Sequence, residues 1–207
     1  DSVMCWNYRV TPAVRVPNLD ATHTFASFAG YCWRKYADPK EEHNTRSDIN
    51  PIVIRYAEVL LNYAEAKIEG NQVDESVYNA INKLRQRTGV AMPAITPGKT
   101  ASEMRSIVRK ERKVELAGEG TRYFDILRWK IAPQLLNGPC YGRIPRGFLS
   151  SAPAIDENGT PDYTGVANRA DMRVIQTRIF DASANYFWPI PDIEIQTNDN
   201  LEQNPGY

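Results

Sequence analysis

The stretch of sequence that decides the fold spans residues 51–69 and reads PIVIRYAEVLLNYAEAKIE. Apolar residues recur in it at steps of three and four, which is the spacing of one face of an α-helix. Ser47 or Asp48 offers a cap, and Pro51 suits the first turn. Gly70 follows, and glycine tolerates the left-handed backbone in which helices end. The pattern predicts a helix over residues 51–69, with an apolar stripe formed by Ile52, Tyr56, Val59, Leu60, Tyr63, Ala64 and Ile68.

Two further helices are expected downstream. A second one runs from Asp74 to Arg87, and the short connection makes the first two an antiparallel hairpin. This hairpin covers about one tetratricopeptide period of ~34 residues, and it buries its stripe only against neighbouring helices. A third helix is expected over residues 102–118, capped by Ser102, and a short fourth one over 122–130. The inward residues of the third helix are predicted to be Met104, Ile107, Val108, Val114 and Leu116.

The flanking sequence is less regular. Residues 1–50 are rich in turn formers, with a short strand expected at 33–36. Residues 131–207 are rich in loops, with a strand expected over 173–180 and a helical turn over 192–196. The sequence therefore predicts a mainly α fold of tetratricopeptide-like helical hairpins with an irregular loop region and a few short strands. Its three stretches are an irregular segment at 1–50, a helical scaffold at 51–130, and a loop and strand region with a tail at 131–207.

Composition excludes several classes of function. The chain has 25 basic and 25 acidic residues, so its balanced charge gives no electrostatic case for binding nucleic acid. No apolar stretch approaches the ~20 residues that cross a bilayer. The sequence opens at Asp1 without a methionine, and we expect it to be a fragment of a longer protein.

One carboxylate cluster deserves a test as a catalytic acid and base. Glu111 and Glu115 lie four residues apart and share one helix face, and Asp125 follows. Cationic side chains at positions 112, 113, 122 and 128 surround them in sequence. Such neighbours hold carboxylates ionised, whereas a general acid must keep its proton. We therefore expect a lattice of structural ion pairs and a protein that is not an enzyme.

Metal and disulfide chemistry have little support in the sequence. The two histidines, His23 and His43, have no metal-binding spacing, and we expect neither a metal nor a cofactor. Cys5, Cys32 and Cys140 form no CxxC pair; they allow one disulfide, such as Cys5 with Cys32, or remain three free thiols. Residues 156–159 resemble half of a calcium loop but are predicted to form a plain turn.

Four segments, in order, resemble the SusD/RagB family. Residues 55–66, RYAEVLLNYAEA, resemble its signature helix, and residues 80–89, AINKLRQRTG, resemble the helix that follows. The segment 111–129, ERKVELAGEGTRYFDILRW, is similar to a third family motif. The closing WPIP at 188–191 and NLEQNPGY at 200–207 resemble the family's terminus. The four matches are spread in order over residues 51–207.

The resemblance implies the C-terminal part of one SusD/RagB-like domain with a helical, tetratricopeptide-like scaffold. It implies an outer-membrane, cell-surface lipoprotein whose partner is a SusC-type TonB-dependent transporter. Family members bind glycans, or in some cases peptides, without cleaving them. They are also longer, so the missing N-terminal part of the same protein, with its lipid anchor, is a further expected partner. The charged motif residues read as ion pairs and caps: Arg55, Glu58, Glu111, Arg112, Glu115, Arg122, Asp125 and Arg128.

These motifs name no ligand residue, so the glycan site is predicted from physical grounds. Sugar rings stack on exposed aromatic faces, while polar side chains fix their hydroxyls. Trp129 and Trp188 lie inside scaffold motifs and are assigned to the core. The glycan-binding candidates come from the two irregular regions: Trp6, Tyr8, Tyr31, Trp33, Tyr141, Arg143 and Phe148.

Three functions compete on this sequence. The first is glycan capture with delivery to the transporter, and the second is a helical-repeat module that binds proteins or peptides. The third is a helical glycosidase, which needs a carboxylate pair free of cationic neighbours. The sequence favours the first.

Overall fold

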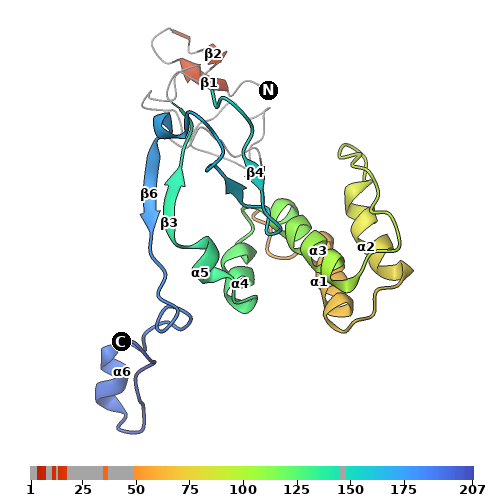
Figure 1. The fold of residues 1–207 in the computed structure, drawn as a ribbon. Coiled ribbons are helices and arrows are strands. Elements are labelled where there is room, and N and C mark those ends of the chain that lie inside the picture. The colour runs from red at the N-terminus through yellow and green to blue at the C-terminus, as the bar shows by residue number, and fades with distance from the viewer. Residues whose placement is uncertain (1–3, 8–10, 13, 18–34, 37–48, 145–147) are drawn as a thin grey trace. The chain divides into compact units, whose positions relative to one another are not determined.

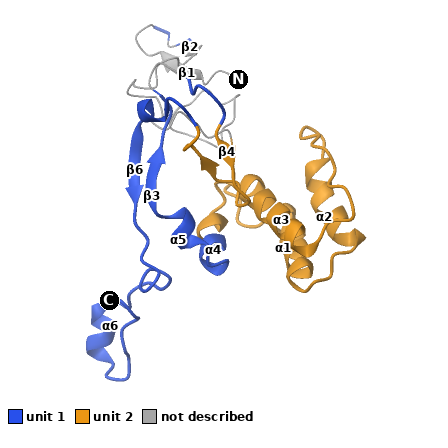
Figure 2. Cartoon of the chain, viewed as in Figure 1, with its two compact units in different colours: residues 1–32, 124–152, 166–207 blue, residues 33–123, 153–165 orange. Residues whose placement is uncertain are grey.

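The computed structural model of the chain describes residues 4–7, 11–12, 14–17, 35–36, 49–144 and 148–207. Their contacts fall into two compact units (Figure 2). Unit 1 comprises residues 1–32, 124–152 and 166–207, and unit 2 comprises residues 33–123 and 153–165. The elements described are mainly helical, with a few short strands, which confirms the predicted fold class (Figure 1).

Unit 2 is built on three helices: α1 (Tyr56–Glu69), α2 (Glu75–Arg85) and α3 (Ala101–Glu115). Helix α1 packs against both of the others, so the predicted hairpin has the neighbour that its apolar face requires. The largest fully buried side chains come from all three helices and the turn after α3. They are Leu61, Ile68, Val77, Ile81, Met104, Val108 and Leu116.

Helix α1 begins five residues later than predicted. Its N-cap is Arg55, whose backbone is extended and whose side chain makes no cap hydrogen bond. Three β-branched residues, 52–54, precede it, and such residues favour extended backbone. The predicted caps Ser47 and Asp48 lie outside the described residues.

The predicted stripe of α1 was only partly right. Ala64 and Ile68 of that stripe are buried, but Tyr56, Val59 and Tyr63 are 59%, 51% and 44% exposed. Leu61, which the predicted stripe left out, is fully buried. The buried face of α1 is made of Ala57 and of the residues four, seven, eight and eleven positions after it, Leu61, Ala64, Glu65 and Ile68. Tyr56, Val59 and Tyr63 form a second, exposed stripe, in which the two tyrosines contact Lys83 and Ser76 of α2 at its edge.

The capping of the other two helices is clear. Asp74 caps α2 by accepting a hydrogen bond from the amide of Ser76. Helix α3 is capped by Thr100, and not by Ser102 as predicted. Thr100 and Glu103 form a reciprocal capping box, which satisfies two otherwise unpaired amides. Val114 was predicted to point inward but is 66% exposed, because α3 turns this position away from the core that Met104 and Val108 enter.

A small hairpin completes unit 2. Strands β4 (Ala154–Ile155) and β5 (Pro161–Asp162) pair in antiparallel fashion. Between them the Asp156 carboxylate accepts hydrogen bonds from the amides of Asn158 and Thr160. This self-bonded loop is the plain turn predicted at 156–159.

Unit 1 has less helix. It contains α4 (Thr121–Arg128), most of which lies in this unit, α5 (Ala132–Leu135) and α6 (Asp192–Thr197), together with the 3₁₀ turn η1 (Arg169–Asp171). Strand β3 (Gly138–Tyr141) pairs with β6 (Val174–Arg178), which confirms the strand expected over 173–180. A small core forms around Ile126, Ala132 and Phe180, and the ring of Tyr186 meets Phe180 edge-on at 5.0 Å.

The N-terminal segment departs from its prediction. Strands β1 (Met4–Asn7) and β2 (Val14–Pro17) pair in antiparallel fashion within a region predicted to be irregular. Four-residue strands are too short to show a two-residue period against nearby turn formers. The strand expected at 33–36 was wrong for its described half, since Lys35 and Tyr36 form a turn and Tyr36 has a φ of 64°.

Candidate functional site

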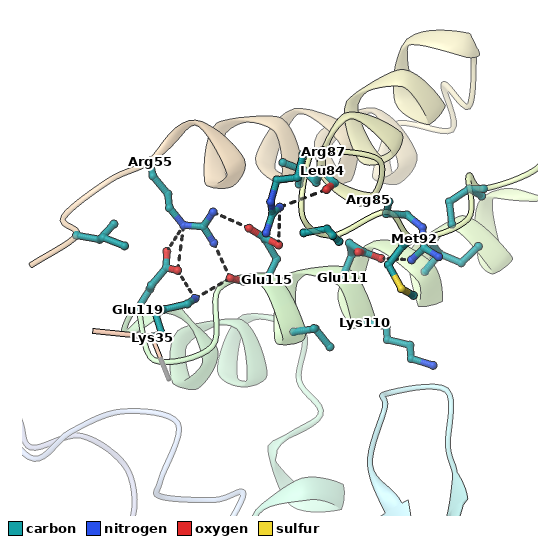
Figure 3. Close-up of a pocket in the computed structure, with 15 residues that line it drawn as sticks. Lys35, Arg55, Leu84, Arg85, Arg87, Met92, Lys110, Glu111, Glu115 and Glu119 are labelled. Carbon is teal, nitrogen blue, oxygen red and sulfur yellow. Dashed lines mark hydrogen bonds and ion pairs between the residues drawn. The ribbon is translucent and has the colours of Figure 1, made fainter. Parts of the chain in front are cut away.

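Unit 2 contains a cavity of about 810 Å³, which is within the size range of small-molecule sites. It is bounded by the start of α1, the α2–α3 connection and the outer face of α3 (Figure 3). One part of its wall is aliphatic: Ile52, Leu84, Val90, Met92, Ile95, Ile107 and Val114. The other part is charged: Lys35, Arg55, Arg85, Arg87, Lys110, Glu111, Glu115 and Glu119.

The aliphatic wall is held in place by the connection between α2 and α3. The side chain of Asn82 accepts a hydrogen bond from the amide of Ile95 at 2.7 Å. The amide of Met92 donates to the carbonyl of Arg85, whose own guanidinium donates to the carbonyl of Pro93. These bonds tie the loop to α2 at several points, so the wall is formed before any ligand arrives.

The charged wall centres on Arg55. Its Nε lies 2.7 Å from Glu119 Oε2, and its NH1 lies 2.6 Å from Glu115 Oε1. Lys35 donates to the same Glu119 carboxylate at 2.5 Å and to the carbonyl of Glu115 at 2.9 Å. The carbonyl of Glu115, the last of α3, thus accepts hydrogen bonds from both Lys35 and Arg55. Two cations at this position stabilise the negative end of the helix dipole. Figure 3 shows these groups converging beside the cavity.

The remaining carboxylates of the cavity are also neutralised. Glu111 pairs with Arg85 at 2.8 Å, and the second oxygen of Glu115 pairs with Arg87 at 2.9 Å. Burial alone raises the pKa of Glu119. The hydrogen bonds and charges of Arg55 and Lys35 outweigh it and hold that pKa below its ordinary value. Each of the three carboxylates is thus engaged by at least one cation of the scaffold.

The ion-pair lattice predicted from the sequence is confirmed for six of its assigned residues: Arg55, Glu111, Arg112, Glu115, Asp125 and Arg128. Most of their partners differ from the expected ones. Glu111 and Glu115 pair with cations of α2, its C-terminal turn and the approach to α1, and not with their sequence neighbours. Only Asp125 uses a neighbour, Arg128, at 2.8 Å. Arg112, also assigned to the lattice, pairs with the buried Glu65 of α1.

The described glycan-binding candidates are placed in unit 1. Tyr141 ends β3, and Arg143 follows it; both are half-buried. The carbonyl of Arg143 accepts a hydrogen bond from the amide of Arg173, which holds this stretch beside β6. Phe148 is 93% exposed, and its carbonyl accepts a hydrogen bond from the Asn168 amide group. Trp6 has a described backbone only, and Tyr8, Tyr31 and Trp33 lie outside the described residues.

The assignment of Trp188 to the core was wrong. Its side chain is 74% exposed, while Trp129 is half-buried. The backbone around Trp188 is fixed by the tail: Asn204 donates to the carbonyl of Trp188, and Gln203 bonds both backbone groups of Ile190. The closing motifs therefore join through their backbones and side-chain amides, which leaves the indole ring outside.

The cavity was not predicted from the sequence. Its usable signal was the apolar content of the α2–α3 connection, where Val90, Met92 and Ile95 occur in a loop that contains Gly89 and Pro93. An apolar loop needs a partner surface, and α3 supplies it through Ile107 and Val114.

The expectations on metals and thiols concern mostly residues outside the described part. His23, His43, Cys5 and Cys32 all lie there or have no described side chain, and Cys140 is a half-buried free thiol. Across residues 49–144 and 148–207 and the shorter described pieces, no three His, Cys, Asp or Glu side chains gather as a metal site would require. None of the helices described is long and apolar enough to cross a membrane.

The geometry defines a class of protein: a helical-hairpin scaffold locked by ion pairs, with loop-borne aromatic and apolar side chains at its surface. Sequence comparison carries this further. The model of the SusD family matches residues 4–207, and the chain belongs to that family.

Relatives and solved structures agree. The chain is 29% identical to SusD-like protein P2 of Formosa agariphila, over 94% of this chain and 31% of that protein. It is 30% identical to SusD-like protein P38 of the same organism, over 46% of this chain and 20% of that protein. A crystal structure of a SusD-like protein from Bacteroides fragilis matches with a TM-score of 0.57 and 32% identity, over 76% of this chain and 26% of that one. The chain thus spans about a third of the length of the P2 relative.

Proposed function

We propose that the protein containing this chain captures glycans at the cell surface without cleaving them. It delivers them to a SusC-type TonB-dependent transporter and is anchored in the outer membrane as a lipoprotein. Membership of the SusD family supports this proposal most directly. In the proposed arrangement this chain forms the C-terminal part of one domain and packs against the rest of the same polypeptide.

The absence of catalysis is supported by the carboxylates themselves. Glu111, Glu115 and Asp125, the acids considered for glycoside cleavage, each lie within 2.9 Å of a cationic nitrogen. A glycosidase needs one carboxyl that holds its proton, and such cations favour the ionised form. Incubation of the full-length protein with candidate glycans should release no reducing ends. Turnover that Glu111→Gln abolishes would overturn this part of the proposal.

Sugar contact is assigned to the aromatic loops of unit 1. Phe148 is the main candidate, because its side chain is 93% exposed. Asn168 fixes the backbone around it by hydrogen bonds to the carbonyl of Phe148 and the amide of Ser150. Tyr141 and Arg143 are proposed to act with it, and Trp6, Tyr8, Tyr31 and Trp33 remain candidates from the N-terminal segment.

The experiment is calorimetry or affinity electrophoresis of the full-length protein against a panel of polysaccharides. For the glycan that binds, Phe148→Ala should weaken binding about tenfold through loss of ring stacking and burial. Phe124→Ala is the matched control, since Phe124 is also exposed but lies on α4. Equal losses in the two variants would remove Phe148 from the site, and failure of every glycan would remove the function.

A helical-repeat module that binds protein or peptide remains the second candidate. The exposed stripe of Tyr56, Val59 and Tyr63 on α1 favours it, because hairpin repeats bury such stripes against a partner. If a peptide library is bound where every glycan fails, this function replaces the first.

A further inference from the structure

We propose that the cavity of unit 2 is a binding site for an aliphatic carboxylate, separate from the glycan site proposed above. The ligand class is a small molecule with a hydrocarbon body and one anionic end. The assignment rests on three features of the cavity wall: its aliphatic lining, its excess of positive charge and its preformed shape.

The lining selects against a sugar. The apolar groups are the side chains of Ile, Leu, Val and Met, and none of the described residues that bound the cavity is aromatic. Sugar rings bind proteins by stacking on aromatic faces and by hydrogen bonds to polar groups. Here the arginine and glutamate side chains already bond one another, as in the pairs Arg55–Glu119 and Arg85–Glu111. A hydrocarbon chain would bury apolar surface against this wall, whereas the hydroxyl groups of a sugar would find few polar side chains that are not already paired.

The charge selects for an anion. Among the described residues, five cationic side chains and three carboxylates bound the cavity, so this part of its wall carries two more positive than negative charges. Each of the three carboxylates has at least one cationic partner within 2.9 Å. Lys110 is different, because its ammonium has no hydrogen bond or ion pair with any part of the chain that the structure describes. The Lys110 stem lies beside Gly159 of the β4–β5 turn and its ammonium points to the rim of the cavity, so the ligand carboxylate is assigned to that rim (Figure 3).

The shape favours a ligand over collapse of the walls. The α2–α3 connection is tied to α2 by the Asn82–Ile95 and Arg85–Met92 hydrogen bonds, and the opposite wall belongs to the packed helix α3. A preformed site loses little conformational entropy when it binds. Val114 and Met92, which are 66% and 47% exposed, bring aliphatic surface to the cavity without belonging to the core.

Calorimetry on the full-length protein can test each feature with a separate probe. Octanoate has both the chain and the carboxylate, octan-1-ol lacks the charge, and glucuronate lacks the chain. We expect octanoate to bind about threefold more tightly than octan-1-ol, which lacks the carboxylate, and at least about tenfold more tightly than glucuronate, which lacks the hydrocarbon chain. Octan-1-ol binding as tightly as octanoate, or glucuronate doing so, would overturn the proposal, and so would an absence of octanoate binding.

Substitutions of residues that bound the cavity test whether octanoate binds there. Val114→Asp puts a carboxylate against the aliphatic wall and should weaken octanoate binding about tenfold or more. Met92→Gln gives a second, milder test of the same wall. Lys110→Gln should lower octanoate affinity about threefold, because the ion pair that Lys110 would form with the ligand carboxylate is exposed to solvent. Lys99→Gln is the control, since Lys99 precedes α3 and does not bound the cavity. Octanoate affinity that none of the three cavity variants lowers would place the binding elsewhere and refute the site. Loss of glycan binding in other variants would leave this result unaffected.

Discussion

Arg55 and Glu119 stand 64 residues apart in the sequence, yet the Nε–H of Arg55 is shared between the two oxygens of the Glu119 carboxylate, at 2.7 and 2.9 Å. Arg55 is the last residue before α1, and Glu119 follows the end of α3. The pair therefore joins the entry of one helix to the exit of another. Glu119 is only 4% exposed, so the contact is largely removed from solvent.

Glu119→Gln should lower the free energy of unfolding substantially. The amide keeps the shape of the carboxylate but leaves Arg55 and Lys35 without their shared anion in a mostly buried setting. Such a loss costs about 3 kcal/mol when the pair is buried. Glu69→Gln removes a carboxylate of the same chemistry that pairs with Arg105 at 2.8 Å but is 42% exposed, and it should cost no more than about 1 kcal/mol. Urea unfolding of both variants measures the difference. Equal losses would show that burial does not govern the strength of these pairs.

Thr100→Ala should destabilise α3 by about 1 kcal/mol, because it removes the side-chain oxygen that accepts the Glu103 amide at 3.2 Å. Ser102→Ala is the matched control. Ser102 is the cap that the sequence predicts, but it lies inside the helix in the structure, so its loss should change stability by only a few tenths of a kcal/mol. Thermal melts that rank the two variants in the opposite order would contradict the observed capping box.

The α1–α2 connection should weaken in acid within a defined window. A hydrogen bond from Lys67, aided by Ser76, lowers the pKa of Asp74 from 3.8 to about 2. The folded state therefore binds this proton more weakly than the unfolded state, and the stabilisation is complete above pH 3.8. It is lost as the pH falls toward about 2. Hydrogen exchange of the Ser76 amide, followed from pH 5 to pH 2, should report the opening. Asp74→Asn should remove this pH dependence, and an unchanged profile in that variant would exclude Asp74 as its source.

Helices were predictable because their signals are local. The three- and four-residue spacing in α1–α3 and the polar residues near their starts are all contained within one segment. The errors arose where tertiary contacts decide. Arg55 ends the extended segment before α1 because its side chain reaches Glu115 and Glu119, and no pattern within residues 51–69 contains that information. Val114 fits an apolar period on paper, but the packing of α3 turns it outward.

The charged residues of the site could be recognised from the sequence, but their partners could not. Glu111 and Glu115 were correctly assigned to ion pairs, yet Arg85 and Arg87 come from the end of α2 and the turn after it. Cavities are still harder to predict, since they depend on how α3 meets the α2–α3 connection. Trp188 was assigned to the core because it lies in a scaffold motif. In the structure it contributes to that motif through its backbone carbonyl, which bonds Asn204, while its side chain is exposed.

Gly206→Ala should detach the C-terminal tail. A Cβ at this position would lie 2.4 Å from the Cβ of Ala184, and the φ of Gly206 is +90°. Gly98→Ala is a close control, because its φ is also +90° but nothing lies within 4 Å of its Cβ position. Both variants carry the backbone strain of about 1 kcal/mol, and only Gly206→Ala adds the clash. Limited proteolysis after residue 184 should therefore accelerate in Gly206→Ala alone. Equal cleavage in the two variants would mean that the tail does not depend on this contact.

The exposed stripe on α1 leaves apolar surface uncovered in the isolated chain. Tyr56, Val59 and Tyr63 lie on one side of the helix, and apolar faces of repeat helices are normally covered by the next pair. The 207-residue chain expressed alone should therefore bind a hydrophobic dye and self-associate, whereas the full-length protein should do neither. Val59→Lys should reduce both effects in the isolated chain without unfolding it, because Val59 is 51% exposed and outside the core. Val53→Lys is the control, since Val53 is 85% exposed but precedes the helix. An isolated chain that stays monomeric and binds no dye would show that this stripe needs no partner.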